Sequence, residues 1–161
     1  MDIKLKSDDY DFKFRIAGCL LVDDSILTVQ MCNNGFYCFP GGHLQLGEDS
    51  KTAIIREFKE ETKFDCHVEK LFAIVENFFK NNSGKLIHEV CFFYLLKSEG
   101  MKKNDFTLTE NDENVLKNLE FKWYKLSELE SVNFKPIILK DKLIKKDFTF
   151  EHIVLDQTKK I

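Results

Sequence analysis

Three glutamates near the middle of the chain have a spacing at which their carboxylates can act together. Residues 49–62 have the apolar periodicity of an amphipathic helix, and Asp49 is suited to cap its start. At about 100° per residue, Glu57, Glu60 and Glu61 fall on one arc beside the apolar stripe of that helix. Carboxylate oxygens are suitable ligands for Mg²⁺ or Mn²⁺, so the arc predicts a divalent-metal site. A solvated acidic face is the alternative that the helix alone leaves open.

Charge repulsion and the preceding glycines both bear on this choice. Glu57 and Glu61 stand at i and i+4, where like charges cost roughly 0.2–0.5 kcal/mol in an isolated helix. A bound cation would remove that cost. Upstream, Gly41 and Gly42 have no Cβ and allow a ligand to approach the backbone closely. Because their turn can offer carbonyl oxygens to a metal ion or amide groups to a phosphate, it supports a ligand site at this place.

The segments on either side must form the scaffold that positions these residues. Residues 68–79 and 86–96 are predicted to form a long hairpin around the turn at residues 81–84. Further elements are expected as strands at residues 12–22, 26–31 and 120–124, and as short helices at residues 127–129 and 136–145, with a short aromatic run at residues 36–39. Because strands precede and follow one strong helix, the order predicts an α+β sandwich rather than a doubly wound parallel sheet.

Taken together, the loop and the helix resemble the Nudix box, a pattern of fixed glycine, glutamate and arginine positions. The segment reads GHLQLGEDSKTAIIREFKEETKF, with its fixed residues at Gly42, Glu48, Arg56, Glu57, Glu60 and Glu61. A shuffled chain of this composition would contain these residues at that spacing on the order of a few times per million. Residues 39–41 and 121–124 also look like this family, so the resemblance extends over residues 12–140. Lys63 departs from the pattern, because the family usually has glycine at this end of the helix; a left-handed cap with a side chain would cost on the order of 1 kcal/mol.

The resemblance implies a Nudix α/β/α sandwich with a mixed central sheet, formed by residues 1–161 as a single domain. It also implies a hydrolase that uses Mg²⁺ or Mn²⁺ to cleave the diphosphate bond of a nucleoside diphosphate linked to another moiety. Nucleoside triphosphates, ADP-ribose or other nucleotide sugars, and dinucleotides all meet that description. The alternative is a catalytically weak nucleotide-sensing module of the same fold. Such modules usually lose box carboxylates, whereas all four glutamates are present here.

Roles for the acidic residues follow from the same resemblance. Glu57, Glu60 and Glu61 would bind the metal ion or act on the attacking water, and the backbone carbonyl of Gly42 would be a further ligand. Glu48 would mainly support the structure of the loop.

Arg56 would give structural support together with Glu48, holding the loop against the helix. Only two of the 24 basic residues of the chain are arginines, Arg15 and Arg56. Because the planar fork of arginine is hard to replace by lysine, a rare arginine inside the box indicates a geometric role.

The residue that removes the proton from the attacking water is not determined by the box. Glu57 and Glu60 are candidates inside it. Outside it, Glu89 lies on the second strand of the predicted hairpin, and Glu110 and Glu113 lie in an acidic stretch. A carboxylate beside the apolar run that follows Glu89 favours a functional task for that residue, whereas a solvated loop is the simpler interpretation for the other two.

Five residues are candidates for contact with the substrate. His43 follows the glycine pair and could touch a phosphate, and Arg15 is a second arginine on a predicted strand. Tyr37, Asn77 and Phe78 could contribute to stacking on a base and hydrogen bonding with it. Packing roles in the loop or the core remain open for each of them.

Composition limits the partners. The chain has 27 acidic and 24 basic residues, a net charge of −3, which disfavours a nucleic-acid polymer as partner because such binding needs a basic face. No window has the roughly 20 apolar residues of a membrane span, and no secretory signal is expected. The five cysteines form no CxxC pair and indicate buried free thiols and a cytoplasmic location. A small nucleotide diphosphate is the expected partner of a monomer or homodimer.

Overall fold

Strands make up about half of the chain that the structure describes. The computed structural model describes residues 1–31, 34–103 and 118–159. Its strands are β1 (Lys4–Lys6), β2 (Tyr10–Val22), β3 (Ser25–Met31), β4 (Tyr37–Cys38), β5 (Gly41–His43), β6 (His67–Lys80), β7 (Leu86–Lys97), β8 (Leu119–Lys125), β9 (Phe134–Lys135) and β10 (Glu151–Asp156). Its helices are α1 (Ser50–Thr62), α3 (Lys140–Ile144) and the 3₁₀ helices η1 (Leu126–Ser131) and η2 (Ile137–Leu139).

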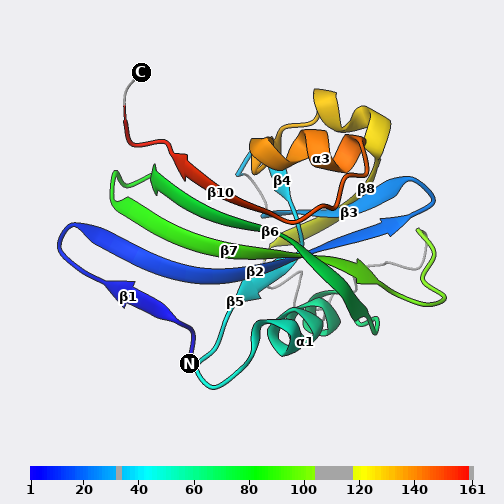
Figure 1. Ribbon diagram of the computed structural model, residues 1–161, viewed down its shortest axis with the longest axis horizontal. Helices are drawn as coiled ribbons and strands as arrows, with labels where there is room; N and C mark the ends of the chain where they lie inside the picture. The colour runs from blue at the N-terminus through cyan, green and yellow to red at the C-terminus, as the bar shows by residue number, and fades with distance from the viewer. Residues whose placement is uncertain (32–33, 104–117, 160–161) are drawn as a thin grey trace.

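The strands join in one bent sheet of mixed direction (Figure 1). Its order is β10-β6-β7-β2-β3-β4-β9, with β1 and β5 also paired to β2, and β8 to β3. The pairs β10–β6, β2–β7 and β4–β9 are parallel, and the other pairs are antiparallel. The predicted hairpin of residues 68–79 and 86–96 is confirmed as the antiparallel pair β6–β7.

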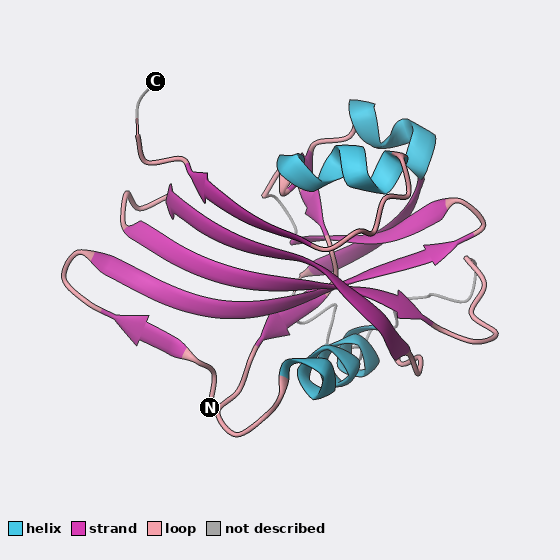
Figure 2. Ribbon diagram, in the orientation of Figure 1, coloured by secondary structure: helices cyan, strands magenta, loops and turns pink. Residues whose placement is uncertain are grey.

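Helices cover both faces of this sheet, with α1 on one side and η1, η2 and α3 on the other (Figure 2). The alternation of side chains along β2 explains why both faces are apolar. Ile16 and Leu20 pack with Ile54 and Phe58 of α1 in one core cluster. Ala17 and Cys19 belong to the second cluster, which contains buried residues of η1 and α3. The predicted α+β class and the α/β/α sandwich with a mixed sheet are therefore confirmed.

Both ends of α1 are determined by single residues. The Asp49 carboxylate accepts hydrogen bonds from the backbone amides of Lys51 and Thr52, at 3.0 Å each, as expected of an N-cap. At the other end Lys63 adopts the left-handed conformation, with φ 66°, and its amide donates to the carbonyl of Lys59. The helix thus keeps a left-handed cap although the residue there is not glycine.

Five short strands, β1, β4, β5, β9 and β10, were not expected from the sequence. Gly41–His43 was predicted to be a loop, and glycine disfavours strands, yet β5 pairs antiparallel with residues 15–17 of β2. This pairing depends on glycine, because a Cβ on Gly41 would come under 3.0 Å from the carbonyl oxygen of Ile16. Strand β1 is an edge strand that forms a tight hairpin with the start of β2, whereas the edge strand β10 depends on pairing with β6, which is distant in sequence. The aromatic run at residues 36–39 contains the two-residue strand β4.

Four of the five cysteines lie in described segments, and Cys19, Cys38, Cys66 and Cys91 are free thiols, as predicted. Cys32 falls outside the described residues. Within the described segments we find no helix with both the length and the apolarity needed to span a bilayer.

Candidate active site

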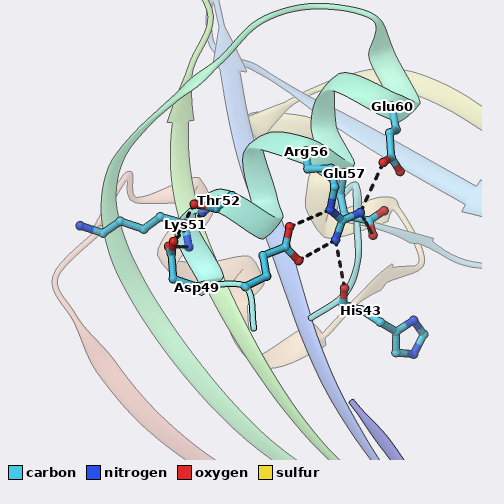
Figure 3. A network of polar contacts seen from close by, with 8 residues as sticks. His43, Asp49, Lys51, Thr52, Arg56, Glu57 and Glu60 are labelled. Atoms are coloured by element: carbon cyan, nitrogen blue, oxygen red, sulfur yellow. Dashed lines mark hydrogen bonds and ion pairs between the residues drawn. The ribbon is translucent and has the colours of Figure 1, made fainter. Parts of the chain in front are cut away.

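Arg56 of α1 is the centre of a network of carboxylates (Figure 3). Its Nε and Nη2 atoms donate to the two carboxylate oxygens of Glu48 at 2.7 and 2.9 Å. This bidentate ion pair joins the helix to the preceding loop. Nη1 donates to Glu57 at 2.8 Å and lies 3.5 Å from Glu60, and Nη2 lies 3.5 Å from the carbonyl oxygen of His43. The Glu48 hydrogen bonds raise the pKa of Arg56 despite burial, and the same contact lowers the pKa of Glu48.

Glu57 is packed directly against the backbone of Gly42. A Cβ built on Gly42 would come under 3.0 Å from the carboxyl carbon and both carboxylate oxygens of Glu57. Residue 42 must therefore lack a side chain for the carboxylate to occupy this place. Because Gly42 pairs with Ile16, whose side chain packs against α1, this contact lies on the α1 face of the sheet.

Arg15 brings α1 together with the long hairpin. It lies half-buried on β2, opposite Cys91 of β7 and His43 of β5. Burial acts against its charge, but nearby acidic groups outweigh this effect and raise the pKa of the guanidinium: first the Glu89 carboxylate, then the Cys91 and Cys38 thiols, and last the Glu61 carboxylate. Glu61 is itself buried, with 7% of its surface exposed. The side chains of these two carboxylates, from α1 and β7, are thus close enough to Arg15 to share one electrostatic environment.

His43 lies beside this cluster with a neutral ring. Burial, followed by the charges of Arg15, Lys4 and Lys13, lowers its pKa to about 4, and only the charge of Asp2 acts in the opposite direction. Its Nδ1 atom is 4.0 Å from an Asp2 oxygen, and its buried Nε2 atom has no hydrogen-bond partner in the described structure. Figure 3 shows the ring pointing away from α1, while its carbonyl faces Arg56.

The remaining predicted substrate residues lie at different places. Asn77 of β6 stands opposite Glu89 in the hairpin, and its side-chain oxygen accepts a hydrogen bond from Gln157 at 2.7 Å. The next residue, Phe78, projects from the other face and stacks on His88 with ring centroids 4.3 Å apart.

Tyr37 lies on β4 and contacts residues of β8. It packs edge-on against Tyr124, with ring centroids 5.1 Å apart, and its hydroxyl lies 3.4 Å from Glu120. Burial and the neighbouring Tyr124 raise its pKa. The contacts of Tyr37 are therefore with the β3–β8 side of the sheet. Two of the candidate proton acceptors, Glu110 and Glu113, fall outside the described residues.

The structure also assigns a neighbour that the sequence did not point to. Asp2 forms an isolated bridge with Gln45, and its carboxylate is 2.8 Å from Lys4 and 4.0 Å from His43. It reaches the segment after the glycine pair through direct backbone bonds, in which the Ile3 amide donates to the Leu44 carbonyl at 2.8 Å and the Leu46 amide to the Met1 carbonyl at 2.9 Å.

The donor chemistry at α1 fits a hard divalent cation, although the carboxylates are not gathered around one point. Among the described residues no three histidine, cysteine, aspartate or glutamate side chains are arranged to hold a metal ion. Glu57 and Glu60 are directed at the Arg56 guanidinium instead. The contact of the Glu57 carboxylate with the glycine backbone nevertheless offers oxygen donors of the type that Mg²⁺ and Mn²⁺ prefer.

A family model for the NUDIX domain matches residues 13–146. The chain belongs to the Nudix family. It is 24% identical over 123 residues to the Nudix hydrolase YvcI of Bacillus subtilis, covering 76% of this chain and 72% of that protein. It is 29% identical over 87 residues to an ADP-ribose pyrophosphatase of Methanocaldococcus jannaschii, covering 52% of each chain.

A solved structure supports the same fold. The mutator MutT protein of Bacillus halodurans superposes with a TM-score of 0.66 at 17% identity, covering 89% of each chain. The predicted Nudix fold is therefore confirmed. With its Nudix box in place on α1, the chain is a Nudix pyrophosphohydrolase, an enzyme that acts on acid anhydrides.

Proposed function

We propose that this Nudix enzyme hydrolyses the diphosphate bond of a nucleoside diphosphate linked to another moiety, in the presence of Mg²⁺ or Mn²⁺. One observation carries the proposal: Arg15 shares its surroundings with Glu61 of the box and Glu89 of the hairpin, next to the Glu57–Gly42 contact. Carboxylates for a cation and a guanidinium for a phosphate thus come from three elements to neighbouring positions, because Arg15 pairs with His43, the residue next to Gly42.

In this proposal the residues of α1 and β5 hold the cation. Glu57, Glu60 and Glu61 would provide carboxylate oxygens and Gly42 its carbonyl oxygen. When bound, the cation supplies charge neutralisation for the diphosphate and stabilises charge that develops on the leaving phosphate. Arg56 and Glu48 would hold the loop against the helix, because their bidentate ion pair joins the two elements.

Glu89 is our choice for the residue that removes the proton from the attacking water. Glu57 and Glu60 are engaged by Arg56, whereas Glu89 lies outside that network and acts on Arg15. Arg15 would contact a phosphate oxygen, and the neutral ring of His43 would approach the same group. Asn77 stands opposite Glu89 and would contact the base, with Tyr37 and Phe78 as more distant candidates.

Several substrates fit the site. One relative is named an ADP-ribose pyrophosphatase and a structural neighbour a mutator MutT protein, so both nucleotide sugars and nucleoside triphosphates belong in a first screen. We further propose that residues 1–161 act as a single Nudix domain. The free thiols support a reducing, cytoplasmic location.

The test is hydrolysis of a panel of nucleoside diphosphate derivatives with Mg²⁺ or Mn²⁺ and with EDTA, both products being identified by chromatography. We expect Glu57→Gln and Glu61→Gln to lower kcat by about 100-fold or more, which corresponds to about 2.7 kcal/mol. Circular dichroism should show an intact fold. Glu69→Gln, at an exposed position of β6, is the matched control and should leave turnover unchanged.

A second variant tests whether the position of the Glu57 carboxylate matters, while the carboxylate itself is kept. In Gly42→Ala the new methyl group must displace the Glu57 side chain, whose flexible end can move without disturbing the backbone. Turnover should therefore fall while the melting temperature changes little. Normal turnover in folded Glu57→Gln and Glu61→Gln would overturn the proposed function, and nucleotide binding without product release would favour a sensing module.

A further inference from the structure

A row of polar side chains crosses the sheet on the face opposite α1. The register pairs Lys4 of β1 with Lys13 of β2, Lys13 with Glu89 of β7, and Glu89 with Asn77 of β6. Residues directly opposite in register project from the same face, so these four side chains form one line perpendicular to the strands. We call them the polar row. It ends at β1, on the part of the sheet that extends beyond both helical layers (Figure 1).

The polar row lies directly beside the candidate active site. Arg15 follows Lys13 by two residues on β2, and a strand rises about 3.3 Å per residue, so the two cations are roughly 7 Å apart along the same face. Arg15 in turn pairs with His43, the neighbour of Gly42. A ligand held by Arg15 therefore needs to extend by only one strand repeat to reach Lys13.

Lys13 has no ion-pair partner among the described residues, although acidic side chains lie near it. Lys4 is matched by Asp2 at 2.8 Å, and Asp11, the next acidic residue on this face of β2, lies 4.0 Å from Lys85. Glu89 stands opposite Lys13 in the register without forming an ion pair with it in the described structure, and its charge acts on Arg15. Within the described residues no carboxylate comes within ion-pair distance of Lys13, which is half-buried rather than fully solvated.

We propose that Lys13, supported by Lys4, forms an anion subsite that binds a phosphate group of the substrate beyond the cleaved diphosphate bond. The enzyme would then select nucleoside diphosphates extended by further phosphate, such as nucleoside triphosphates, over those whose second moiety is a neutral sugar. This inference rests on the proposed function, because it concerns the substrate of the same site. Lysine suits this role, since an ammonium group is a compact charge that can follow a flexible chain of phosphates.

The negative charge of Asp2 counteracts the positive charge of the subsite. Variants of Lys13 and Asp2 should therefore change phosphate binding in opposite directions. The Asp2 carboxylate neutralises Lys4 and stands at the same end of the polar row. Removing the positive charge of Lys13 should weaken binding of an extended phosphate chain, and removing the negative charge of Asp2 should strengthen it. A general loss of stability would move both variants in the same direction.

The experiment compares kcat/KM for ATP and for ADP-ribose in the wild type, Lys13→Met, Asp2→Asn and Lys97→Met. Lys97 is an exposed lysine at the far end of β7 and serves as control. We expect Lys13→Met to lower kcat/KM for ATP about tenfold through KM, as suits loss of one charge-assisted contact. ADP-ribose hydrolysis should stay within about twofold, and Asp2→Asn should raise kcat/KM for ATP about two- to threefold.

Failure of this inference is distinguishable from failure of the proposed function. An equal effect of Lys13→Met on both substrates, or no effect on either, would overturn the subsite while hydrolysis itself stands. Wild-type cleavage of ADP-ribose without cleavage of ATP would overturn it too. If the wild type hydrolyses neither substrate, calorimetric titration with inorganic tripolyphosphate decides: weaker binding by Lys13→Met supports the subsite, and unchanged binding overturns it.

Discussion

At the scale of single residues, the two arginines of the site have different roles. Arg56 contacts Glu48, Glu57 and Glu60 with one planar group, a geometry that an ammonium group cannot reproduce. Its role was readable from the box and from the rarity of arginine in a lysine-rich chain. Arg15 carries the same rarity, but its neighbours Glu61 and Glu89 come from other elements. No local pattern could reveal them, because they depend on which strands lie side by side.

His43 makes the stability of the fold depend on pH. Its pKa in the folded protein is about 4, below the ordinary 6.5, so the unfolded chain takes up a proton that the folded chain excludes. Stability should therefore fall as the pH is lowered from about 6.5 to about 4, by roughly 1–2 kcal/mol after allowance for solvent screening. Urea unfolding in EDTA at several pH values measures this slope. His43→Gln should lack this contribution, and an unchanged slope in the variant would contradict the assignment.

At the scale of elements, α1 was predictable because its signals are local. Its apolar stripe, the Asp49 cap and the charged arc are all contained in one short segment, and the structure bears out the helix and its cap. Strands β5 and β10 were missed for the opposite reason. Glycine-rich Gly41–His43 extends only because β2 offers a partner, and Glu151–Asp156 only because β6 does. The sequence of one segment does not indicate which other strand will pair with it.

The left-handed backbone conformation of Lys63 lowers the stability of the fold, and a glycine at this position would remove that effect. Lys63 holds φ 66° at the C-terminal end of α1, where glycine would be free of the clash between Cβ and backbone. Lys63→Gly should therefore stabilise the protein by about 0.5–1 kcal/mol, measured by thermal unfolding, without a change in turnover. Lys63→Ala removes the ammonium group but keeps the Cβ, and should give no such gain. Equal stabilisation by both variants would show that charge, not backbone conformation, is responsible.

At the scale of the whole molecule, the core extends beyond the segment that resembles the family. The Nudix match ends at residue 146, yet β10 pairs in parallel with β6 along six positions. Its Ile153 and Leu155 pack against the same core cluster as the buried residues of η1 and α3. The final strand is therefore part of the hydrophobic core on the face that the polar row shares.

Neighbouring residues of β10 provide a matched test of this packing. Ile153→Ala removes apolar contacts with the core and should lower the unfolding free energy by about 1–2 kcal/mol. Val154→Ala, one residue on, changes a side chain that is 61% exposed and should cost less than about 0.5 kcal/mol. Thermal unfolding of both variants measures the difference. Equal melting temperatures would show that β10 contributes backbone pairing alone.

The free thiols have a consequence for chemical durability. Burial raises the pKa of Cys38 and Cys66 to about 11, and that of Cys19 and Cys91 further. At neutral pH roughly one Cys38 or Cys66 thiol in ten thousand is therefore ionised, and the thiolate is the form that alkylating agents and peroxide attack. The four thiols in the described part of the folded protein should consequently react slowly with oxidants and alkylating agents at neutral pH.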